Sequence, residues 1–320
     1  MKLLNTPPPV HLRLLSVFVL LSILISSGCR KSSPGHHGSI YATIAANPNY
    51  SILTYAINKA GLKNTLDKLS ETNLTLFAPD DKAFESIGIT SGAALGSLPD
   101  STLTAILLYH VLSHEVKAAD IPQADNTPVT TVNGKPIYAT RTQAGKVYIN
   151  GVPVTKADIT CTNGVIHDIS SVLMPPGGTI VQTAIANPNL SLLVAAVLRA
   201  SQGSTDVAAV LSGAGPFTVF APTNKAFVNA GFPNAAAINA ADPNTLTKIL
   251  TYHVIAGRIF SSDLVDGSTP ATVNGETVKI MLGSGAQVKG NGNTSPSNII
   301  LTNIVTTNGV VHVIDQVLLP

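Results

Sequence analysis

The chain has 320 residues, of which 45% are hydrophobic, and a formal net charge of +2. At roughly 100–200 residues per domain, this length predicts about two domains. Only 11% of the residues are charged and no long basic run exists, which argues against a nucleic-acid partner because such binding normally leaves a clustered Lys/Arg footprint.

The N-terminal segment has the pattern of a secretory signal peptide. Lys2 and Arg13 precede an apolar run over residues 14–25, and small residues follow at 26–28. A positive flank, a short apolar stretch and a small-residue exit are typical of such signals. The run is too short to favour a membrane-spanning helix, which needs about 20 apolar residues. We therefore expect residues 1–28 to act as an export signal.

Cys29 follows this segment and resembles the lipid-modified cysteine of a bacterial lipobox, although Ser26 stands where that pattern usually has leucine. An ordinary signal peptide with an incidental cysteine is the alternative. Residues 29–38 are polar and contain Gly and Pro, as a flexible tether does. We expect a protein of the cell envelope, anchored to a membrane by lipid on Cys29 and lying in the periplasm or at the cell surface. The other cysteine, Cys161, is expected to be a small buried thiol, with no disulfide framework.

The rest of the chain contains the same module twice. The segment FAPDDKAF at 77–84 returns as FAPTNKAF at 220–227, and ILLYHV at 106–111 returns as ILTYHV at 249–254. Two further blocks, TVNG and NGV(I/V)H, also occur once in each copy and in the same order. Such self-similarity means that one structural unit has been repeated.

A Pro/Gly cluster at 175–178 separates the two copies. Proline and glycine clusters of this kind are typical of linkers. The expected organisation is a signal peptide at 1–28, a tether at 29–38, one module at 39–176 and a second module at 177–320.

Each module is predicted to begin with helices. In the first, an amphipathic helix over 51–60 with Ser51 as N-cap precedes a strand over 73–77. Asp80 is expected to cap a short helix, and another helix is expected over about 101–110. The corresponding features of the second copy are 191–200 with Ser191, 216–220, Thr223 and 244–253.

The second half of each module is predicted to be rich in strands. Val, Ile and Thr runs are interrupted by Asn133-Gly134, Asn150-Gly151 and Asn163-Gly164. Asn-Gly pairs favour the tight turns of β-hairpins. Helices followed by a series of antiparallel strands predict an α+β fold.

These blocks, in this order, resemble the signatures of the fasciclin (FAS1) family. The FAPxxxAF block is similar to its first signature, the Tyr-His pair to its central one, and NGV(I/V)H with the following Val-Leu-x-Pro to its closing one. The resemblance covers residues 39–320. It implies two compact modules, each a β-sandwich wedge with packed helices. It also implies a role in adhesion, usually outside the cell and often with a membrane tether.

The Tyr-His pairs are the candidates for function. His110 and His253 fall on the apolar stripe of their predicted helices, which favours a structural core role over catalysis or metal binding. Tyr109 and Tyr252 project about 100° away from these histidines by helix geometry. Because the resemblance associates this region with receptor binding, the tyrosines are interaction candidates. Packing at the edge of the wedge is the alternative.

The sequence carries no motif for a nucleophile elbow, a zinc helix, an EF-hand or a phosphate-binding loop. We therefore expect no catalytic residues, no cofactor and no metal. The leading hypothesis is a non-enzymatic adhesion or interaction protein that binds an extracellular protein or polysaccharide. One alternative is a glycan-binding or scaffolding lipoprotein without a role in cell attachment, and another is a hydrolase that uses Tyr-His or Ser-His chemistry.

Overall fold

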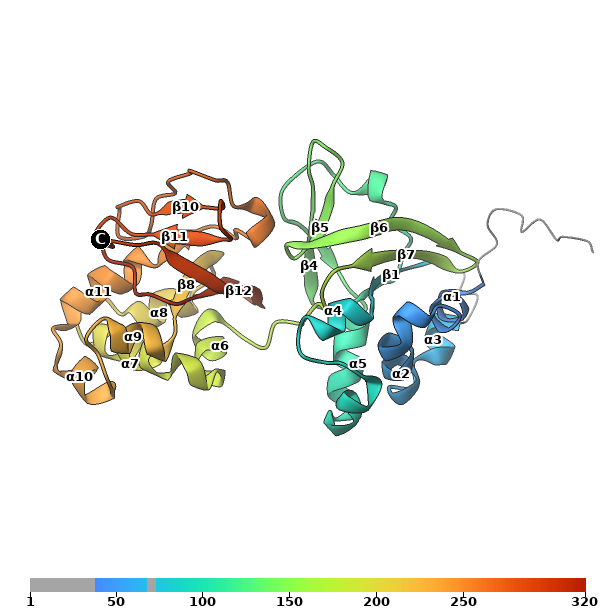
Figure 1. Cartoon of the computed structure of the whole chain (residues 1–320), viewed down its shortest axis with the longest axis horizontal. Coiled ribbons are helices and arrows are strands. Elements are labelled where there is room, and N and C mark those ends of the chain that lie inside the picture. The colour runs from blue at the N-terminus through green and yellow to red at the C-terminus, as the bar shows by residue number, and fades with distance from the viewer. Residues whose placement is uncertain (1–37, 68–72) are drawn as a thin grey trace, which may run out of the picture. The chain divides into compact units, whose positions relative to one another are not determined.

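The computed structural model describes residues 38–67 and 73–320, so the predicted signal peptide and Cys29 lie outside the described residues. Helices and strands of the first copy run from Ile40 to Ile169, and those of the second copy from Ile180 to Ile314 (Figure 1). We call residues 39–176 the first module and residues 177–320 the second module.

The first module alternates short helices with strands and then ends in a series of strands. Its elements are α1 (Ile40–Ala45), η1 (Pro48–Tyr50), α2 (Ser51–Lys59), α3 (Lys63–Asp67), β1 (Leu74–Pro79), α4 (Asp81–Glu85), η2 (Gly92–Ser97), α5 (Asp100–Tyr109), β2 (Val111–Leu112), η3 (Ala118–Asp120), β3 (Thr127–Thr130), β4 (Pro136–Arg141), β5 (Val147–Ile149), β6 (Val152–Cys161) and β7 (Gly164–Ile169).

The second module repeats this order with one more α-helix and one strand fewer among its described elements. They are α6 (Ile180–Ala186), η4 (Pro188–Leu190), α7 (Ser191–Ala200), α8 (Val207–Ser212), β8 (Phe217–Pro222), α9 (Asn224–Asn229), α10 (Ala235–Ala240), α11 (Pro243–Tyr252), β9 (Val254–Ala256), η5 (Ser261–Asp263), β10 (Lys279–Met281), β11 (Gln287–Lys289), β12 (Ser297–Thr306) and β13 (Gly309–Ile314).

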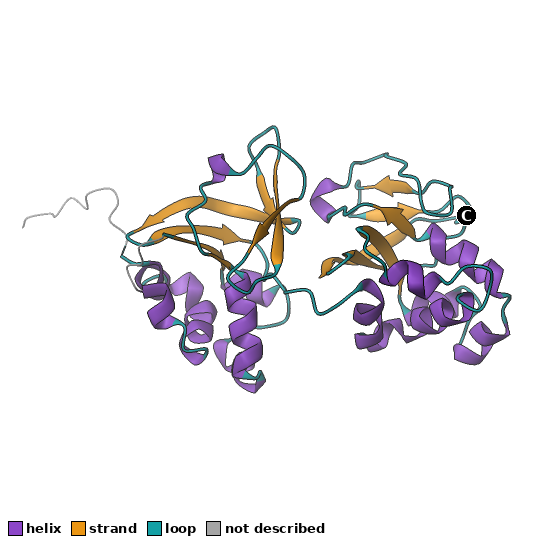
Figure 2. Ribbon diagram, turned by 180° about the vertical axis from the view of Figure 1, so that it is seen from behind, coloured by secondary structure: helices purple, strands orange, loops and turns teal. Residues whose placement is uncertain are grey.

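Each module has one mixed sheet with helices packed beside it, which confirms the α+β prediction. The strand order is β2-β1-β7-β6-β5-β4-β3 in the first module and β10-β11-β12-β13-β8-β9 in the second. β1 pairs with β7, and β8 with β13, in parallel, whereas all other pairs of named strands are antiparallel. In each module the helices gather on one side of the strands (Figure 2).

The sheet curls over on itself and encloses a core of its own. In the first module one cluster of buried side chains joins Phe77 on β1 and Leu112 on β2 with Ile137 on β4 and Ile149 on β5, although these pairs of strands lie far apart in the strand order. Strands so distant in one sheet share a core only if the sheet bends around it. A second cluster lies between the sheet and the helices. The second module has the same two layers.

Several local predictions are confirmed and one is wrong. Asp80 accepts a hydrogen bond from the Ala83 N–H at 2.8 Å and so caps α4. The Asn150-Gly151 pair, with φ of 51° and 76°, forms the turn between β5 and β6. Ser51, however, does not cap α2, because it is the first helical residue. The segment that precedes it forms η1, whose cap is the side chain of Asn47.

Helix α7 and its counterpart α2 carry the apolar faces that fill the helix-side cores.

In the part of the chain that the structure describes, no single helix is long and apolar enough to span a membrane. The bent pair Ile180–Ala186 and Pro188–Ala200, with 108° between its parts, passes that test by length and composition alone. Leu193 and Ala196 of this pair are buried in the core of the second module.

Candidate functional site

Tyr109 and Tyr252 are among the most deeply buried side chains of the described chain, each 0% exposed. As interaction candidates they are therefore closed off from the surface, and the alternative of packing within the wedge is favoured. α5 packs one face against the helix-side core, but its last residue, Tyr109, enters the core that the curled sheet encloses. Tyr252 does the same at the end of α11. Sequence periodicity indicated one buried stripe, whereas the end of the helix is covered from two directions.

Both tyrosines hold the sheet together through their hydroxyl groups. The Tyr109 hydroxyl donates to the Pro136 carbonyl at 2.9 Å and accepts from the side-chain amide of Asn150 at 3.1 Å. The Tyr252 hydroxyl donates to the Thr277 carbonyl at 2.7 Å and accepts from the Asn291 N–H at 2.9 Å. Burial raises the pKa of Tyr109 to about 12, so its phenol stays protonated and able to donate at neutral pH.

His110 and His253 lie in the core, as expected, each directly after the last residue of its helix. The His110 Nδ1–H donates to the Ile106 carbonyl at 2.8 Å, and its Nε2 accepts from the Leu173 N–H at 2.9 Å. His253 makes the same two bonds, at 2.8 Å each, to the backbone of Ile249 and Leu318. Burial lowers the pKa of both imidazoles to about 4. Each ring is neutral and has both nitrogens engaged.

The other repeated histidines, His167 and His312, adopt the opposite tautomer, with the proton on Nε2 instead of Nδ1. The His167 Nε2–H donates to the Val116 carbonyl at 2.8 Å, and its Nδ1 accepts from the Asp158 N–H at 3.2 Å. His312 makes equivalent bonds, at 2.9 and 3.3 Å, with Ile259 and Asn303. Each ring also faces the phenylalanine of the FAP block, with centroids 5.6 Å apart for Phe77–His167 and 5.8 Å apart for Phe220–His312.

The repeated sequence blocks therefore meet one another inside each module. The Phe77 N–H donates to the His110 carbonyl at 2.9 Å, which joins the first block to the central one. His110 in turn reaches the closing Val-Leu-Met-Pro segment through Leu173. These motifs form the internal frame of the fold, and they do not form an exposed site.

No group of three or more His, Cys, Asp or Glu side chains suited to a metal ion occurs among the described residues. Cys161 is a free, buried thiol whose pKa is raised by burial, and its Sγ–H donates to the Thr43 hydroxyl at 3.4 Å. A raised pKa disfavours the thiolate, which is the reactive form. This agrees with the expectation of a small buried thiol.

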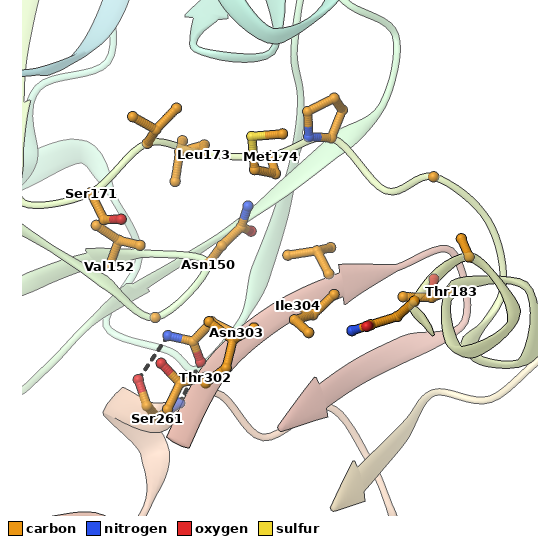
Figure 3. A pocket seen from close by; sticks show the side chains of 18 of the residues that line it. Asn150, Val152, Ser171, Leu173, Met174, Thr183, Ser261, Thr302, Asn303 and Ile304 are labelled. Atoms are coloured by element: carbon orange, nitrogen blue, oxygen red, sulfur yellow. Dashed lines mark hydrogen bonds between the residues drawn. The ribbon is translucent and has the colours of Figure 1, made fainter. Parts of the chain in front are cut away.

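An open cleft of about 810 Å³ lies at the junction of the two modules (Figure 3). Its walls come from the β5–β6 turn, the segment that follows β7, helix α6 and strand β12. At its floor the side-chain amide of Asn303 donates through Nδ2 to the Ser261 hydroxyl at 2.7 Å, and Asn303 Oδ1 accepts from the backbone N–H of Ser261 at 2.8 Å.

The lining of this cleft is uncharged. Its polar side chains are Asn150, Ser170, Ser171, Gln182, Thr183, Asn187, Ser261, Thr302 and Asn303, and its larger aliphatic ones are Val152, Val172, Leu173, Met174, Leu301, Ile304 and Val305. Met174 is 54% exposed and Leu301 is 51% exposed. Exposed aliphatic side chains with amide and hydroxyl groups around them suit a partner that is neutral and partly apolar.

Comparison with known proteins identifies the class. The fasciclin domain matches residues 48–175 and again 189–320. The chain therefore belongs to the fasciclin domain family and contains two such domains in tandem.

Relatives occur in bacteria and in animals. Residues of this chain are 42% identical over 145 positions to "Protein sll1483" of Synechocystis, covering 44% of this chain and 73% of the relative. "Transforming growth factor-beta-induced protein ig-h3" of Sus scrofa is 28% identical over 248 residues, covering 78% of this chain but only 35% of the relative. The match to periostin of Homo sapiens is 27% identical and covers 78% of this chain and 28% of that protein. A solved FAS1 domain pair from the insect cell adhesion molecule fasciclin I is similar at 20% identity, with a TM-score of 0.40 over 84% of this chain and 96% of that one.

Sequence reasoning found the repeated motifs but not the cleft. Its walls come from segments as distant as Asn150 and Asn303, and most of its side chains are Ser, Thr, Asn, Val and Leu, which carry no motif. The one local signal was Asn150-Gly151, which marked the turn that forms part of one wall.

Proposed function

We propose that this chain is a non-enzymatic interaction protein of the cell envelope that binds a protein or glycan partner through its tandem fasciclin domains. The junction cleft is the proposed contact site. The observation that carries this proposal is the pair of half-exposed aliphatic side chains, Met174 and Leu301, in an uncharged cleft of about 810 Å³. A methionine is well suited to such a site because its flexible, polarisable side chain adapts to the surface of a partner.

The geometry of the four repeated histidines speaks against the Tyr-His form of the hydrolase alternative. A general base must reach the substrate with a free nitrogen. In His110, His167, His253 and His312 both ring nitrogens are occupied by backbone groups, and all four rings are buried. Tyr109 and Tyr252 are equally closed off. The Tyr-His pairs therefore support the fold.

Competition for attachment tests the adhesion role. Cells that display the protein are allowed to attach to a surface in the presence of purified residues 30–320, and the added protein is expected to reduce attachment in a concentration-dependent way. Unchanged attachment, together with co-purification of a single envelope partner, would favour the alternative of a scaffolding or glycan-binding lipoprotein.

We also propose that Cys29 carries a lipid that holds the chain in a membrane of the envelope. The support for this is the apolar run at 14–25 followed by Gly28-Cys29. Replacing Cys29 by Ala is expected to release the protein from the membrane fraction into the soluble one. Retention of the variant in the membrane fraction would contradict the anchor.

A further inference from the structure

The two modules contact each other through complementary polar groups at one edge of the cleft. Asn126 of the first module, which precedes β3, donates through its side-chain amide to the Arg258 carbonyl and to the Asp263 carboxylate, both at 2.9 Å. Asp263 also accepts from the Phe260 N–H at 2.8 Å. One asparagine thus recognises the backbone and the capping carboxylate of the same short segment of the second module.

An aromatic and cationic stack lies beside these hydrogen bonds. The Arg258 guanidinium carbon is 4.1 Å from the centroid of the Tyr138 ring of the first module. The Phe260 ring lies 6.0 Å from the Tyr138 ring, between centroids, and is 0% exposed. The guanidinium also donates to the carbonyls of Thr306 and Gly309, so its position over the ring is held by its own module. Cation–π contacts of this kind are strongest where the cation is partly desolvated.

A glycine permits the close approach of the two modules. Gly151 has a φ of +76°, and a Cβ atom placed there would lie 2.7 Å from Phe260 Cβ and 2.7 Å from Asn303 Nδ2. No Cβ contact that short is tolerated without movement, so the β5–β6 turn fits against the second module only with glycine at this position.

The internal repeat shows that these residues are not needed to fold a module. Arg258 and Phe260 correspond to Glu115 and Lys117, because the segments after both histidines make the same bonds: Lys117 N–H to Asp120 and Phe260 N–H to Asp263. Glu115 and Lys117 pair with each other at 3.7 Å on the surface. In the first module, two charged surface residues thus occupy the positions that an arginine and a buried phenylalanine occupy at the junction in the second module.

The opposite face shows the same exchange. Tyr138 lies two residues after Pro136, the acceptor of the Tyr109 hydroxyl, and Lys279 lies two residues after Thr277, the acceptor of the Tyr252 hydroxyl. The counterpart of Tyr138 is therefore Lys279, which is exposed. Arg258, Phe260 and Tyr138 thus have charged counterparts, Glu115, Lys117 and Lys279, at the faces that have no module against them.

We propose that the Tyr138–Asn126 face of the first module is a specific docking surface whose partner is the Arg258–Asp263 segment of the second module, and that this contact fixes the two modules as one directional unit. The junction cleft is then a composite site, because its two walls come from different modules that this contact holds at a set distance. The charged counterparts at the two free faces, Glu115 with Lys117 and Lys279, restrict this docking to the single junction within the chain.

The distance between two spin labels tests the proposal in the mature chain 30–320. Labels are placed at Ile87→Cys and Val228→Cys, which are exposed residues of different modules, with Cys161→Thr to remove the native thiol. We expect a single narrow distance distribution. A Tyr138→Lys variant, which sets a second cation against Arg258, should lose it and give a broad distribution. Lysine is the residue that the other copy carries at this position, so each module is expected to remain folded by circular dichroism.

Two further variants make the result specific. Asn126→Gly removes both intermodule hydrogen bonds without touching the stack and should also broaden the distribution. The matched controls, Lys279→Tyr and Lys117→Phe, place the junction residues on the free faces and should leave it narrow. A broad distribution in the unaltered chain, or a narrow one in both junction variants, would overturn the proposal. Equal broadening in the controls would also overturn it.

Discussion

The side-chain amide of Asn150 donates a hydrogen bond of 3.1 Å to the hydroxyl of Tyr109. The side-chain oxygen of Asn150, Oδ1, accepts from the Tyr138 N–H at 2.8 Å, and the backbone N–H of Asn150 donates to the Tyr138 carbonyl at 2.7 Å. The end of α5 is thereby linked to the turn that bears Gly151 and to the strand that bears Tyr138. Tyr109, which the sequence offered as a candidate for interaction, is buried and supports the junction from within.

Replacing Tyr109 by Phe should destabilise the first module. The change leaves the buried amide of Asn150 and the Pro136 carbonyl without their partner, and an unsatisfied buried polar group costs about 1–3 kcal/mol. Urea denaturation of the 30–320 chain should show this loss in the transition of the first module. Tyr252→Phe is the matched variant and should affect the second module instead. Unchanged stability in both variants would show that these hydroxyl bonds contribute little.

Acid should weaken the fold before its carboxylates are neutralised. His110 and His253 have a folded-state pKa of about 4, below the unfolded value of about 6.5. The folded state disfavours the charged ring. The unfolding free energy is therefore unaffected by these histidines above about pH 6.5, and it decreases as the pH falls from there toward 4. The expected loss is about 3 kcal/mol per histidine at the acid end.

Urea denaturation at a series of pH values from 7.5 to 4.5 measures this loss. A chain with His110→Gln and His253→Gln, if folded, should show a flatter dependence of the unfolding free energy on pH, because these positions no longer titrate. An equally steep dependence in that variant would assign the acid sensitivity to other groups.

One polar pair is present in the first module alone. The Tyr50 hydroxyl donates to the Asp168 carboxylate, and burial raises the pKa of both groups. Leu190 ends η4 as Tyr50 ends η1, and Val313 pairs with Ala221 as Asp168 pairs with Ala78. The second module thus fills the same positions with aliphatic side chains.

The double replacement Tyr50→Leu/Asp168→Val should leave the stability at pH 7 equal or higher, because the desolvated carboxylate is removed together with its partner. Tyr50→Leu alone should cost about 1–3 kcal/mol, since it leaves the ionised Asp168 half-buried without its donor. The raised pKa of Asp168 makes the free energy of unfolding decrease as the pH rises through that pKa. This decrease should be absent from the double variant, which lacks the carboxyl group. A double-mutant cycle with no coupling between the two sites would contradict this description.

Much of the fold could be predicted because its signals are local. The Asn150-Gly151 turn and the Asp80 cap depend on residues next to them in the chain, and Thr223 repeats the cap in the second copy. The parallel pairing of β1 with β7 was not predicted. It joins Leu74 to Gly164, and no local pattern specifies which distant strand will be the neighbour.

The functional surface could be predicted less well. Periodicity showed which face of α5 is buried but not that the curled sheet covers its end, so the sequence left open whether Tyr109 is a contact residue or a packed one. The differences between Glu115 and Arg258, and between Tyr138 and Lys279, are visible in the sequence. Their meaning appears only when the fold places Tyr138 and Arg258 against each other.

The most direct test of the proposed binding function is a charge placed in the junction cleft. Met174→Asp and Leu301→Asp should each weaken the competition for attachment about tenfold or more, as expected when a central apolar contact worth about 1.4 kcal/mol or more is lost. The controls Ile87→Asp and Val228→Asp, at exposed aliphatic residues that do not line the cleft, should compete like the unaltered protein. Full competition by both cleft variants would contradict the assignment of the cleft as the binding site.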